Sequence, residues 1–249
     1  MSTSNTDIRK HRERFHIGSF DSDLQGNAKL TSICNYFQEI AGHHADLIHQ
    51  GIDDLKTNNL SWILSRLKIQ IFDTAKWKDC IDIETWSVGT DGLFGNREFR
   101  IYNKTGDVIA QGSSAWLVFN TKTKRLIRPQ EIVAKMPINS ENPINGGSLS
   151  KIPTIKNATY IEDIHIHYSD IDFYQHVNNV KYVKWAIDSC LPEIKKGKTI
   201  KELEINYLHE AKLDQILELY NLTQDSTSQI IIKTKGTNIE NCRTIIHWK

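Results

Sequence analysis

The sequence predicts an α+β protein built from two halves of similar plan. Apolar residues between positions 30 and 48 recur every three or four residues, as in an amphipathic helix. Residues 63–71 then alternate between apolar and polar side chains, as in a strand. The same succession of a helical segment and alternating segments returns after residue 160. We therefore expect each half to bury one long helix against strands.

Composition excludes several classes of protein. The chain has 249 residues, of which 39% are hydrophobic, enough to supply one large or two small cores. Thirty-one basic side chains against 30 acidic ones leave a net charge of +1, so no nucleic acid is expected as a partner. No apolar run reaches the ~20 residues that span a bilayer, and residues 1–16 lack the apolar region of a signal peptide. We expect a cytoplasmic protein without a membrane span.

In the first half, we expect a strand before the helix and four after it. Their predicted ranges are 15–23, 63–71, 81–88, 97–102 and 108–120. His43 and His44 are adjacent on the helix and point about 100° apart, so we expect hydrogen-bonded or solvated side chains rather than a metal site. Arg97 is expected at the surface or in an ion pair. The four cysteines are scattered through apolar segments, and we expect them in the core rather than in disulfides, at a metal or as a nucleophile.

Proline and glycine separate the two halves. Four of the five prolines lie between residues 129 and 153, in a stretch also rich in Asn, Ser and Gly. Proline removes backbone donors and glycine loosens the chain, so regular structure is not expected there. The sequence predicts an N-terminal domain at 1–137, a linker at 138–158 and a C-terminal domain at 159–249.

The second half repeats the plan of the first. A strand is expected at 160–169, a helix at 177–191 and further strands at 203–207, 216–222, 229–235 and 244–248. When Asp172 is aligned with Asp23, His176 falls on Asn27. This indicates a degenerate duplication in which only the second copy carries the histidine. The chemistry is therefore expected in the second half.

Residues 172–185 combine reactive side chains with a helix start. Asp172, Tyr174, His176 and Asn178 lie within seven residues, directly before apolar positions at helical spacing. Free backbone N–H groups around His176 and Val177, with the positive end of the helix dipole, could stabilise an oxyanion. Helix capping alone would explain Asp172 and Asn178, but not a histidine and a tyrosine beside them. The segment is therefore a candidate reaction site.

The pattern Asp-x-x-x-His-Val-Asn-Asn-x-x-Tyr-x-x-Trp at 172–185 resembles the signature of acyl-acyl carrier protein thioesterases of plants and bacteria. Further similar segments are 36–39, 62–66, 85–86, 97–99, 113–116 and 121–125. The resemblance implies a tandem (double) hot-dog fold, in which each domain packs a long helix on an antiparallel sheet. It also implies release of free fatty acid from acyl-acyl carrier protein, which terminates fatty-acid synthesis, without a cofactor or metal ion. The first domain would hold the acyl chain and the second would catalyse.

Three candidate catalytic residues match the family. His176 suits proton transfer because imidazole titrates near neutral pH. The resemblance implies that Glu210, in the segment 207–211, activates water or orients the imidazole. It also implies a role for Asp172, either as a nucleophile or as an orienting group.

Two positions depart from the family. Ala211 stands where many relatives have a cysteine, which excludes a mechanism that needs that thiol. Tyr174 replaces an asparagine, and a phenol cannot reproduce the donor and acceptor of an amide. The enzyme therefore uses a variant site or has reduced activity, and the role of Tyr174 stays open.

The implied partners are the acyl carrier protein with its acyl-phosphopantetheine arm and the fatty acyl chain; a homodimer is left open. Because such carriers are acidic, Lys181 and Lys184 are candidates for a basic docking patch. Two alternatives remain. One is a hot-dog thioesterase acting on coenzyme A thioesters, and the other is an acyl-binding protein with impaired catalysis. Tyr174 favours the second, while the presence of Asp172, His176 and Glu210 together argues against it.

Overall fold

The computed structural model describes residues 8–139, 144 and 148–249. Within these ranges the chain forms two compact units. The described residues of the first are 8–64, 72–139, 144 and 148–149, and the second comprises 65–71 and 150–249. The predicted linker at 138–158 includes residues 140–143 and 145–147, which lie outside the described residues. The predicted domain boundaries therefore stay a prediction.

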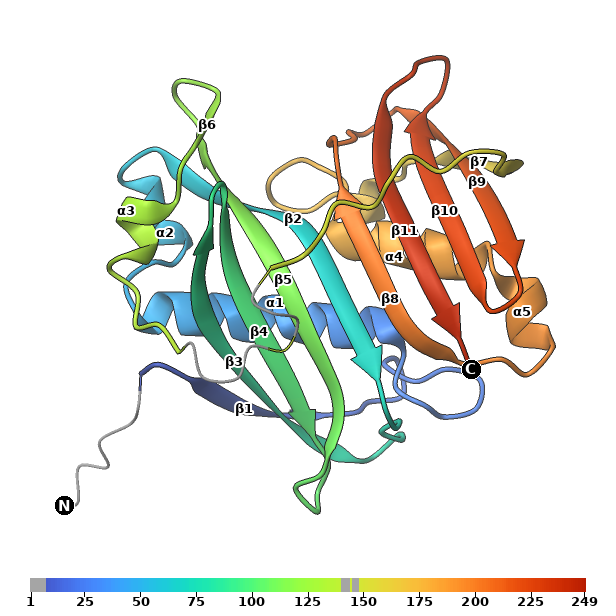
Figure 1. Ribbon diagram of the computed structural model, residues 1–249, viewed down its shortest axis with the longest axis horizontal. Coiled ribbons are helices and arrows are strands. Elements are labelled where there is room, and N and C mark those ends of the chain that lie inside the picture. The colour runs from blue at the N-terminus through green and yellow to red at the C-terminus, as the bar shows by residue number, and fades with distance from the viewer. Residues whose placement is uncertain (1–7, 140–143, 145–147) are drawn as a thin grey trace. The chain divides into compact units, whose positions relative to one another are not determined.

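The first unit is an antiparallel sheet with a long helix on one face (Figure 1). Its strands follow the order β1-β3-β4-β5-β2, and β6 pairs with β5. The elements are β1 (His11–His16), α1 (Leu30–Leu47), α2 (Ile52–Lys56), β2 (Leu60–Ile71, of which 60–64 belong to this unit), β3 (Cys80–Asp91), β4 (Phe94–Tyr102), β5 (Val108–Asn120), β6 (Arg125–Ile127) and α3 (Gln130–Val133).

The second unit repeats this topology. Its strands follow the order β7-β9-β10-β11-β8, and residues 66–70 of β2 pair with β8. The elements are β7 (Thr159–His165), the 3-10 turn Tyr168–Asp170, α4 (Asn179–Asp188), α5 (Leu191–Lys195), β8 (Ile200–Tyr207), β9 (Ile216–Gln224), β10 (Thr227–Thr234) and β11 (Glu240–Trp248). The predicted repetition is confirmed, because the sheet order of the two units is the same with β7 in the place of β1.

The helices form where the apolar period predicts them. On α1, Ile33, Phe37 and Ile40 are buried at spacings of three and four, and the ring of Phe37 stacks on Phe99 of β4 at 4.2 Å between centroids. The predicted helix at 30–48 is thus confirmed to within one residue. The predicted helix at 177–191 is too long, because α4 ends at Asp188 and the chain restarts as α5 with a proline in its first turn.

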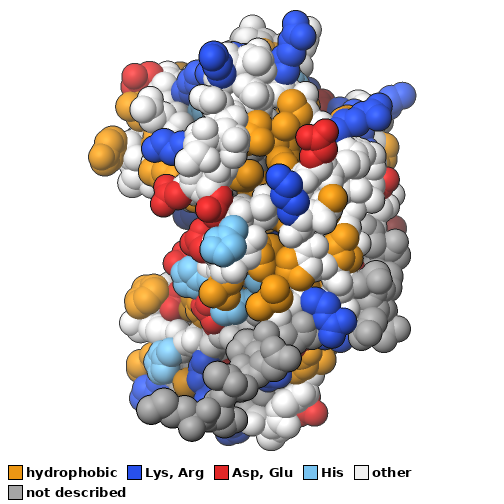
Figure 2. All heavy atoms as spheres, turned by 90° about the vertical axis from the view of Figure 1, so that its left-hand side faces the viewer, with side chains coloured by type: hydrophobic (Ala, Val, Ile, Leu, Met, Phe, Trp, Pro, Cys, Tyr) orange, Lys and Arg blue, Asp and Glu red, His pale blue; other side chains and the backbone are white. Residues whose placement is uncertain are grey.

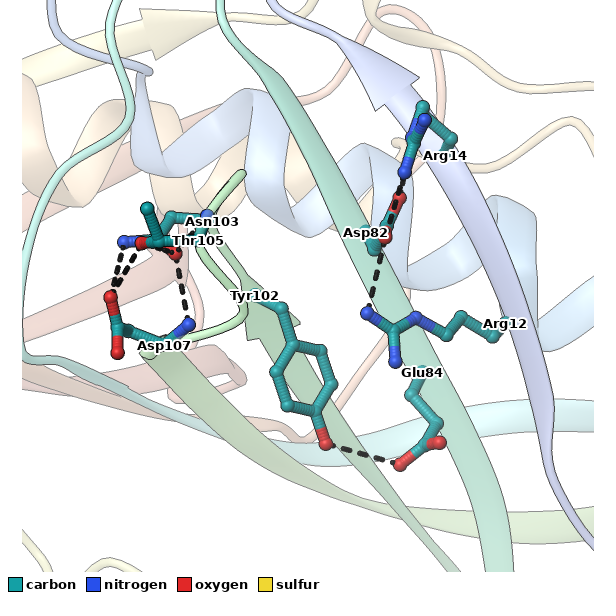
Figure 3. A network of polar contacts seen from close by, with 8 residues as sticks. All are labelled: Arg12, Arg14, Asp82, Glu84, Tyr102, Asn103, Thr105 and Asp107. Atoms are coloured by element: carbon teal, nitrogen blue, oxygen red, sulfur yellow. Dashed lines mark hydrogen bonds and ion pairs between the residues drawn. The ribbon is translucent and has the colours of Figure 1, made fainter.

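The first strand was predicted wrongly at 15–23, since β1 spans His11–His16. Its hydrophilic sequence is typical of an edge strand, where charged side chains meet solvent or a neighbouring strand. Arg12 donates to Asp82 of β3 at 3.1 Å and Arg14 does so at 2.7 Å, as Figure 3 shows. The hydrogen bond from Arg14 is the largest contribution that lowers the pKa of Asp82. A search for alternating apolar residues misses a strand that is held to its neighbour by ion pairs between charged side chains.

The two adjacent histidines of α1 lie in different surroundings. His43 bonds the carboxylate of Glu13 on β1 at 2.8 Å, and on the face in Figure 2 histidine side chains lie beside acidic ones. His44 is buried; its Nδ1 accepts from Arg97 at 2.9 Å and its Nε2 donates to the carbonyl of Ile8. Arg97 is buried too, so its donors meet neutral acceptors rather than the carboxylate or solvent expected. Burial lowers the pKa of Arg97 to about 10.

Part of the predicted linker packs on the second unit. Ile152 and Ile155 are buried against Ile231 of β10, without a regular element. The N–H of Ile152 donates to Oδ1 of Asn206 at 2.7 Å, and its carbonyl accepts from Arg243 at 3.0 Å. This part of the chain is therefore fixed to the sheet by its backbone. Over the described ranges, no helix is both long enough and apolar enough to cross a membrane.

Candidate active site

A closed loop leads from the 3-10 turn to α4. The N–H of Asp172 donates to the carbonyl of His176, and the N–H of Gln175 donates to the carbonyl of Asp172, both at 2.9 Å. Oδ1 of Asp172 accepts the N–H of Tyr174 at 2.9 Å, which is an Asx turn. Gln175 has a φ of +67°, in the left-handed region that non-glycine residues seldom adopt. These bonds fix the conformation of the loop at residues 172–176.

A buried aspartate that the sequence did not single out fixes the base of this loop. Asp170 is 9% exposed, and its carbonyl accepts the N–H of Asn178 at 2.9 Å. Its carboxylate accepts the N–H of His167 at 2.9 Å and lies 3.1 Å from Nζ of Lys181. Asn178 in turn caps α4 by accepting the N–H of Val180 at 2.8 Å. An aspartate two residues before Asp172, with a lysine in the first turn of the helix, is the signal that could have indicated it.

The structure brings His176 and Glu210 into contact. Nε2 of His176 lies 3.0 Å from Oε2 of Glu210, and the side chains are 30% and 52% exposed. A backbone hydrogen bond also joins the two segments, since the N–H of Val177 donates to the carbonyl of Ala211 at 2.9 Å. A carboxylate at this distance holds the imidazole in one orientation. The exposure leaves water free to reach the pair.

The other two predicted residues make different contacts. The Asp172 carboxylate is engaged by the loop backbone, and within the described parts of the chain no hydrogen bond joins it to the imidazole of His176 or to Glu210. The ring of Tyr174 packs on Phe173 with 4.1 Å between centroids, and both rings are exposed. Of the four predicted residues, His176 and Glu210 therefore meet through their side chains, and Asp172 adjoins them through the loop.

One of the expected oxyanion donors is already engaged. The N–H of Val177 is bonded to Ala211, and the N–H of Asn178 is bonded to Asp170. The expectation that Val177 offers a free N–H is therefore wrong, because that group clamps the loop to the segment carrying Glu210. The backbone N–H of His176 makes no hydrogen bond within the described residues.

Comparison with known proteins identifies the family. The family description "Acyl-ACP thioesterase N-terminal domain" matches residues 8–136, and "Acyl-ACP thioesterase C-terminal domain" matches residues 154–249. The chain belongs to the acyl-ACP thioesterase family. The resemblance found in the sequence is thereby confirmed.

Relatives and solved structures agree with this membership. The chain is 28% identical over 246 residues to oleoyl-acyl carrier protein thioesterase 2, chloroplastic, of Arabidopsis thaliana, covering 92% of this chain and 66% of that protein. It thus spans slightly less than two thirds of that relative. An acyl-ACP thioesterase structure from Bacteroides thetaiotaomicron matches with a TM-score of 0.88 and 24% identity over 100% of both chains. The 12:0-ACP thioesterase from Umbellularia californica matches with a TM-score of 0.83 and 22% identity, over 96% of this chain and 97% of that one. The predicted α+β tandem hot-dog fold is confirmed.

This family member has no thiol beside its histidine. Ala211, at the position of the family's cysteine, is fully buried. Cys34, Cys190 and Cys242 are buried as expected, whereas Cys80 is exposed on β3 of the first unit. Burial raises the pKa of Cys242 to about 12, so this thiol stays protonated. A mechanism that needs a thiol directly after Glu210 is therefore excluded.

The two lysines considered for carrier docking both have acidic partners. Lys181 lies 3.1 Å from Asp170, and Lys184 lies 2.7 Å from Asp188 one turn along α4. The side chain of Lys181 is 31% exposed, so most of it is buried within the unit. Neither lysine adds net positive charge to its surroundings, and the structure gives no support to a patch built on them.

Proposed function

We propose that the protein is a thioester hydrolase that acts on acyl-acyl carrier protein, releases the free fatty acid and so terminates fatty-acid synthesis. The contact between His176 and Glu210 at 3.0 Å carries the proposal. Membership of the acyl-ACP thioesterase family supports the carrier protein as partner, and it supports the second unit as the catalytic one. The cytoplasmic location and the role of the first domain in holding the acyl chain are part of the same proposal.

The proposed chemistry is addition of water followed by loss of the thiol. A water molecule beside the His176–Glu210 pair attacks the carbonyl carbon and gives a proton to the pair. The carbon–sulfur bond breaks when the tetrahedral intermediate collapses, and the pair returns the proton to the departing sulfur. One thioester and one water thus give one carboxylic acid and one thiol.

Two further groups are placed to help. The N–H of His176 is available to donate to the developing oxyanion close to the start of α4, where the helix dipole favours negative charge. The Asp172 carboxylate accepts the N–H of Tyr174 and so helps to fix the loop that carries His176. In this mechanism Asp172 orients His176 through the loop, while water is the nucleophile.

The substrate assignment is tested by direct hydrolysis. We expect the purified protein to release fatty acid and free thiol from acyl-acyl carrier proteins, with a higher kcat/KM than from the matching coenzyme A thioesters, over a series of chain lengths. A higher kcat/KM on coenzyme A thioesters would overturn the carrier as physiological partner. Binding of acyl groups without any hydrolysis would overturn the enzymatic proposal in favour of an acyl-binding protein.

The site assignment is tested by a matched pair of variants. Glu210→Gln keeps the shape of the side chain but cannot accept a proton at neutral pH, and we expect turnover to fall by about 10²- to 10⁴-fold. Glu162→Gln makes the same chemical change at an exposed glutamate of β7 and should leave turnover unchanged. Equal turnover of Glu210→Gln and the wild type would exclude Glu210 from the reaction.

A further inference from the structure

Strand β11 carries a bulge opposite the segment that holds Glu210. Ile232 of β10 pairs with Cys242, and Lys233 pairs with Glu240, so Asn241 has no partner on β10. Its carbonyl instead accepts the N–H groups of Leu208 at 2.8 Å and His209 at 3.3 Å. A bulge aims one residue out of the regular ladder, and bulges are common beside active sites. Here the extra residue, Asn241, bonds the segment that directly follows β8.

Both ends of the Asn241 side-chain amide make hydrogen bonds. It is 0% exposed, and its Nδ2 donates to the carbonyls of His209 and Glu210, both at 3.3 Å. Because carbonyls only accept, these two partners fix which end of the amide is the nitrogen, and Oδ1 accepts the hydroxyl of Thr234 at 3.0 Å. Asn241 thus binds the segment 208–210 through both its backbone and its side chain.

The first unit shows which of these bonds the fold itself requires. There the bulge residue on β5 is Ile109, since Ile101 of β4 pairs with Ala110 and Tyr102 pairs with Val108. The carbonyl of Ile109 accepts two successive N–H groups, from Phe72 at 2.9 Å and Asp73 at 3.0 Å, as that of Asn241 does.

The side chains at the two bulges differ. Ile109 is 5% exposed and has no polar group to offer. Ala75 accepts the N–H of Ala28 at 2.8 Å, as Ala211 accepts that of Val177 at 2.9 Å, so the counterpart of Glu210 in the first unit is Thr74. The bulge is therefore common to both units, whereas the buried amide occurs in the unit that carries the glutamate.

We propose that Asn241 is a positioning residue that holds the Glu210 carboxylate at Nε2 of His176. It acts by tying the carbonyls of His209 and Glu210 to the rigid sheet, which restricts the backbone from which an otherwise half-exposed glutamate projects. The proposal rests on the proposed function, in which Glu210 takes part in proton transfer.

The first experiment replaces the amide by a side chain of nearly the same size. We expect Asn241→Leu to lower kcat by about 10- to 100-fold, with KM changed much less, because two hydrogen bonds to the segment are lost. Asn221→Leu is the matched control. Asn221 is buried in the same unit, and its amide bonds the carbonyl of Ser189 at 3.1 Å rather than the site. The control should lose stability without a comparable loss of kcat.

A double-mutant cycle separates positioning from a purely structural role. If Asn241 acts through Glu210, then Asn241→Leu should cost less than about twofold in a Glu210→Gln background. Thr234→Val, which removes the hydroxyl that orients the amide, provides a milder second variant if Asn241→Leu folds poorly. It should show a smaller loss of kcat with the same dependence on Glu210.

The outcomes are distinct. Loss of kcat in Asn241→Leu that disappears in the Glu210→Gln background supports the proposal. Equal losses in both backgrounds, or a wild-type kcat for both Asn241→Leu and Thr234→Val, would overturn it and leave the proposed function standing. A wild-type kcat for Glu210→Gln alone would overturn the role of Glu210, and the positioning role with it.

Discussion

The loops that precede α1 and α4 share most of their hydrogen bonds and differ in their side chains; the N–H of Asn27 also donates to Oδ1 of Asp23 at 2.8 Å, a bond that is not found for the N–H of His176 in the described residues. Each is closed by a bond from an aspartate N–H to the carbonyl four residues later. This bond runs from Asp23 to Asn27 at 2.8 Å in the first unit and from Asp172 to His176 at 2.9 Å in the second. In each, the aspartate Oδ1 accepts the N–H two residues on, and the residue before Asn27 or His176 has a positive φ.

The bases of the two loops also match. Asp21 and Asp170 are both buried, and their carbonyls accept the N–H of Lys29 at 2.7 Å and of Asn178 at 2.9 Å. The first unit makes these bonds with no histidine at the end of the loop. The loop therefore starts a helix in both units, and the proposed chemistry depends on the difference between Asn27 and Thr74 in the first unit and His176 and Glu210 in the second.

The largest expected effect comes from removing the difference between the two loops at this position. His176→Asn gives the second loop the side chain that the first loop carries at Asn27. Because the loop bonds involve the backbone and Asp172, the variant should stay folded, with a melting temperature within a few degrees of the wild type. Turnover should fall by about 10²- to 10⁴-fold, since the proton carrier is lost. Undiminished turnover in steady-state thioester hydrolysis would show that the difference between the loops is not catalytic.

The next effect separates the charge of Asp172 from its part in the loop. The Asx turn needs only an oxygen acceptor, which asparagine also supplies, so Asp172→Asn should fold normally. We expect turnover to fall on the order of 10²-fold, the size of an electrostatic contribution to the transition state, because the variant removes the negative charge from the loop that carries His176. Asp23→Asn makes the same change in the first loop and should leave both turnover and melting temperature unaltered. If Asp172→Asn is equally silent, Asp172 serves the loop alone.

Sequence reasoning succeeded where one periodicity or one local motif decides the structure. The period of three and four predicted α1, and alternation predicted the strands that follow it. The family resemblance implied Glu210 beside His176, and the structure places their side chains in contact, while their part in the reaction stays a prediction. Sequence reasoning missed β1, whose cross-strand bonds come from arginines, and Asn241, because a bulge and its partners are far apart in sequence and become neighbours only when β11 pairs with β8.

A third prediction compares the two units in acid. Burial, the largest cause, lowers the pKa of His44 on α1 from 6.5 to about 4. Glu193 on α5 lies as far beyond the start of α4 as His44 lies beyond the start of α1, and its pKa is lowered from 4.5, chiefly by a hydrogen bond from Lys196. Unfolding frees His44 to take up a proton below about pH 6.5, so its contribution to stability is lost as the pH falls from 6.5 towards 4. The contribution of Glu193 is lost only below about pH 4.5.

The first unit should therefore weaken first. By pH 5 we expect its free energy of opening to drop by roughly 2 kcal/mol, at about 1.4 kcal/mol per pKa unit. Amide hydrogen exchange, corrected for the intrinsic rate, should then show lost protection in α1 but not in α4. His44→Asn, which keeps an acceptor for Arg97 without a titrating ring, should flatten this dependence. Equal loss of protection in both helices would contradict the assignment to His44.

The smallest expected effect concerns Tyr174, whose counterpart in the first loop is Gln25. The N–H of Gln25 bonds Asp23 at 2.9 Å as the N–H of Tyr174 bonds Asp172, so the loop does not depend on the side chain at this position. The Tyr174 ring packs on Phe173, and both rings are exposed. We therefore expect Tyr174→Phe to change kcat less than about threefold, whereas loss of an oxyanion donor would cost about 10- to 10³-fold. Tyr174→Asn restores the residue of the family and should raise kcat, because an amide can donate and accept at the same place. A wild type without hydrolysis, together with an active Tyr174→Asn, would make this chain an acyl-binding protein whose loss of catalysis rests on a single side chain.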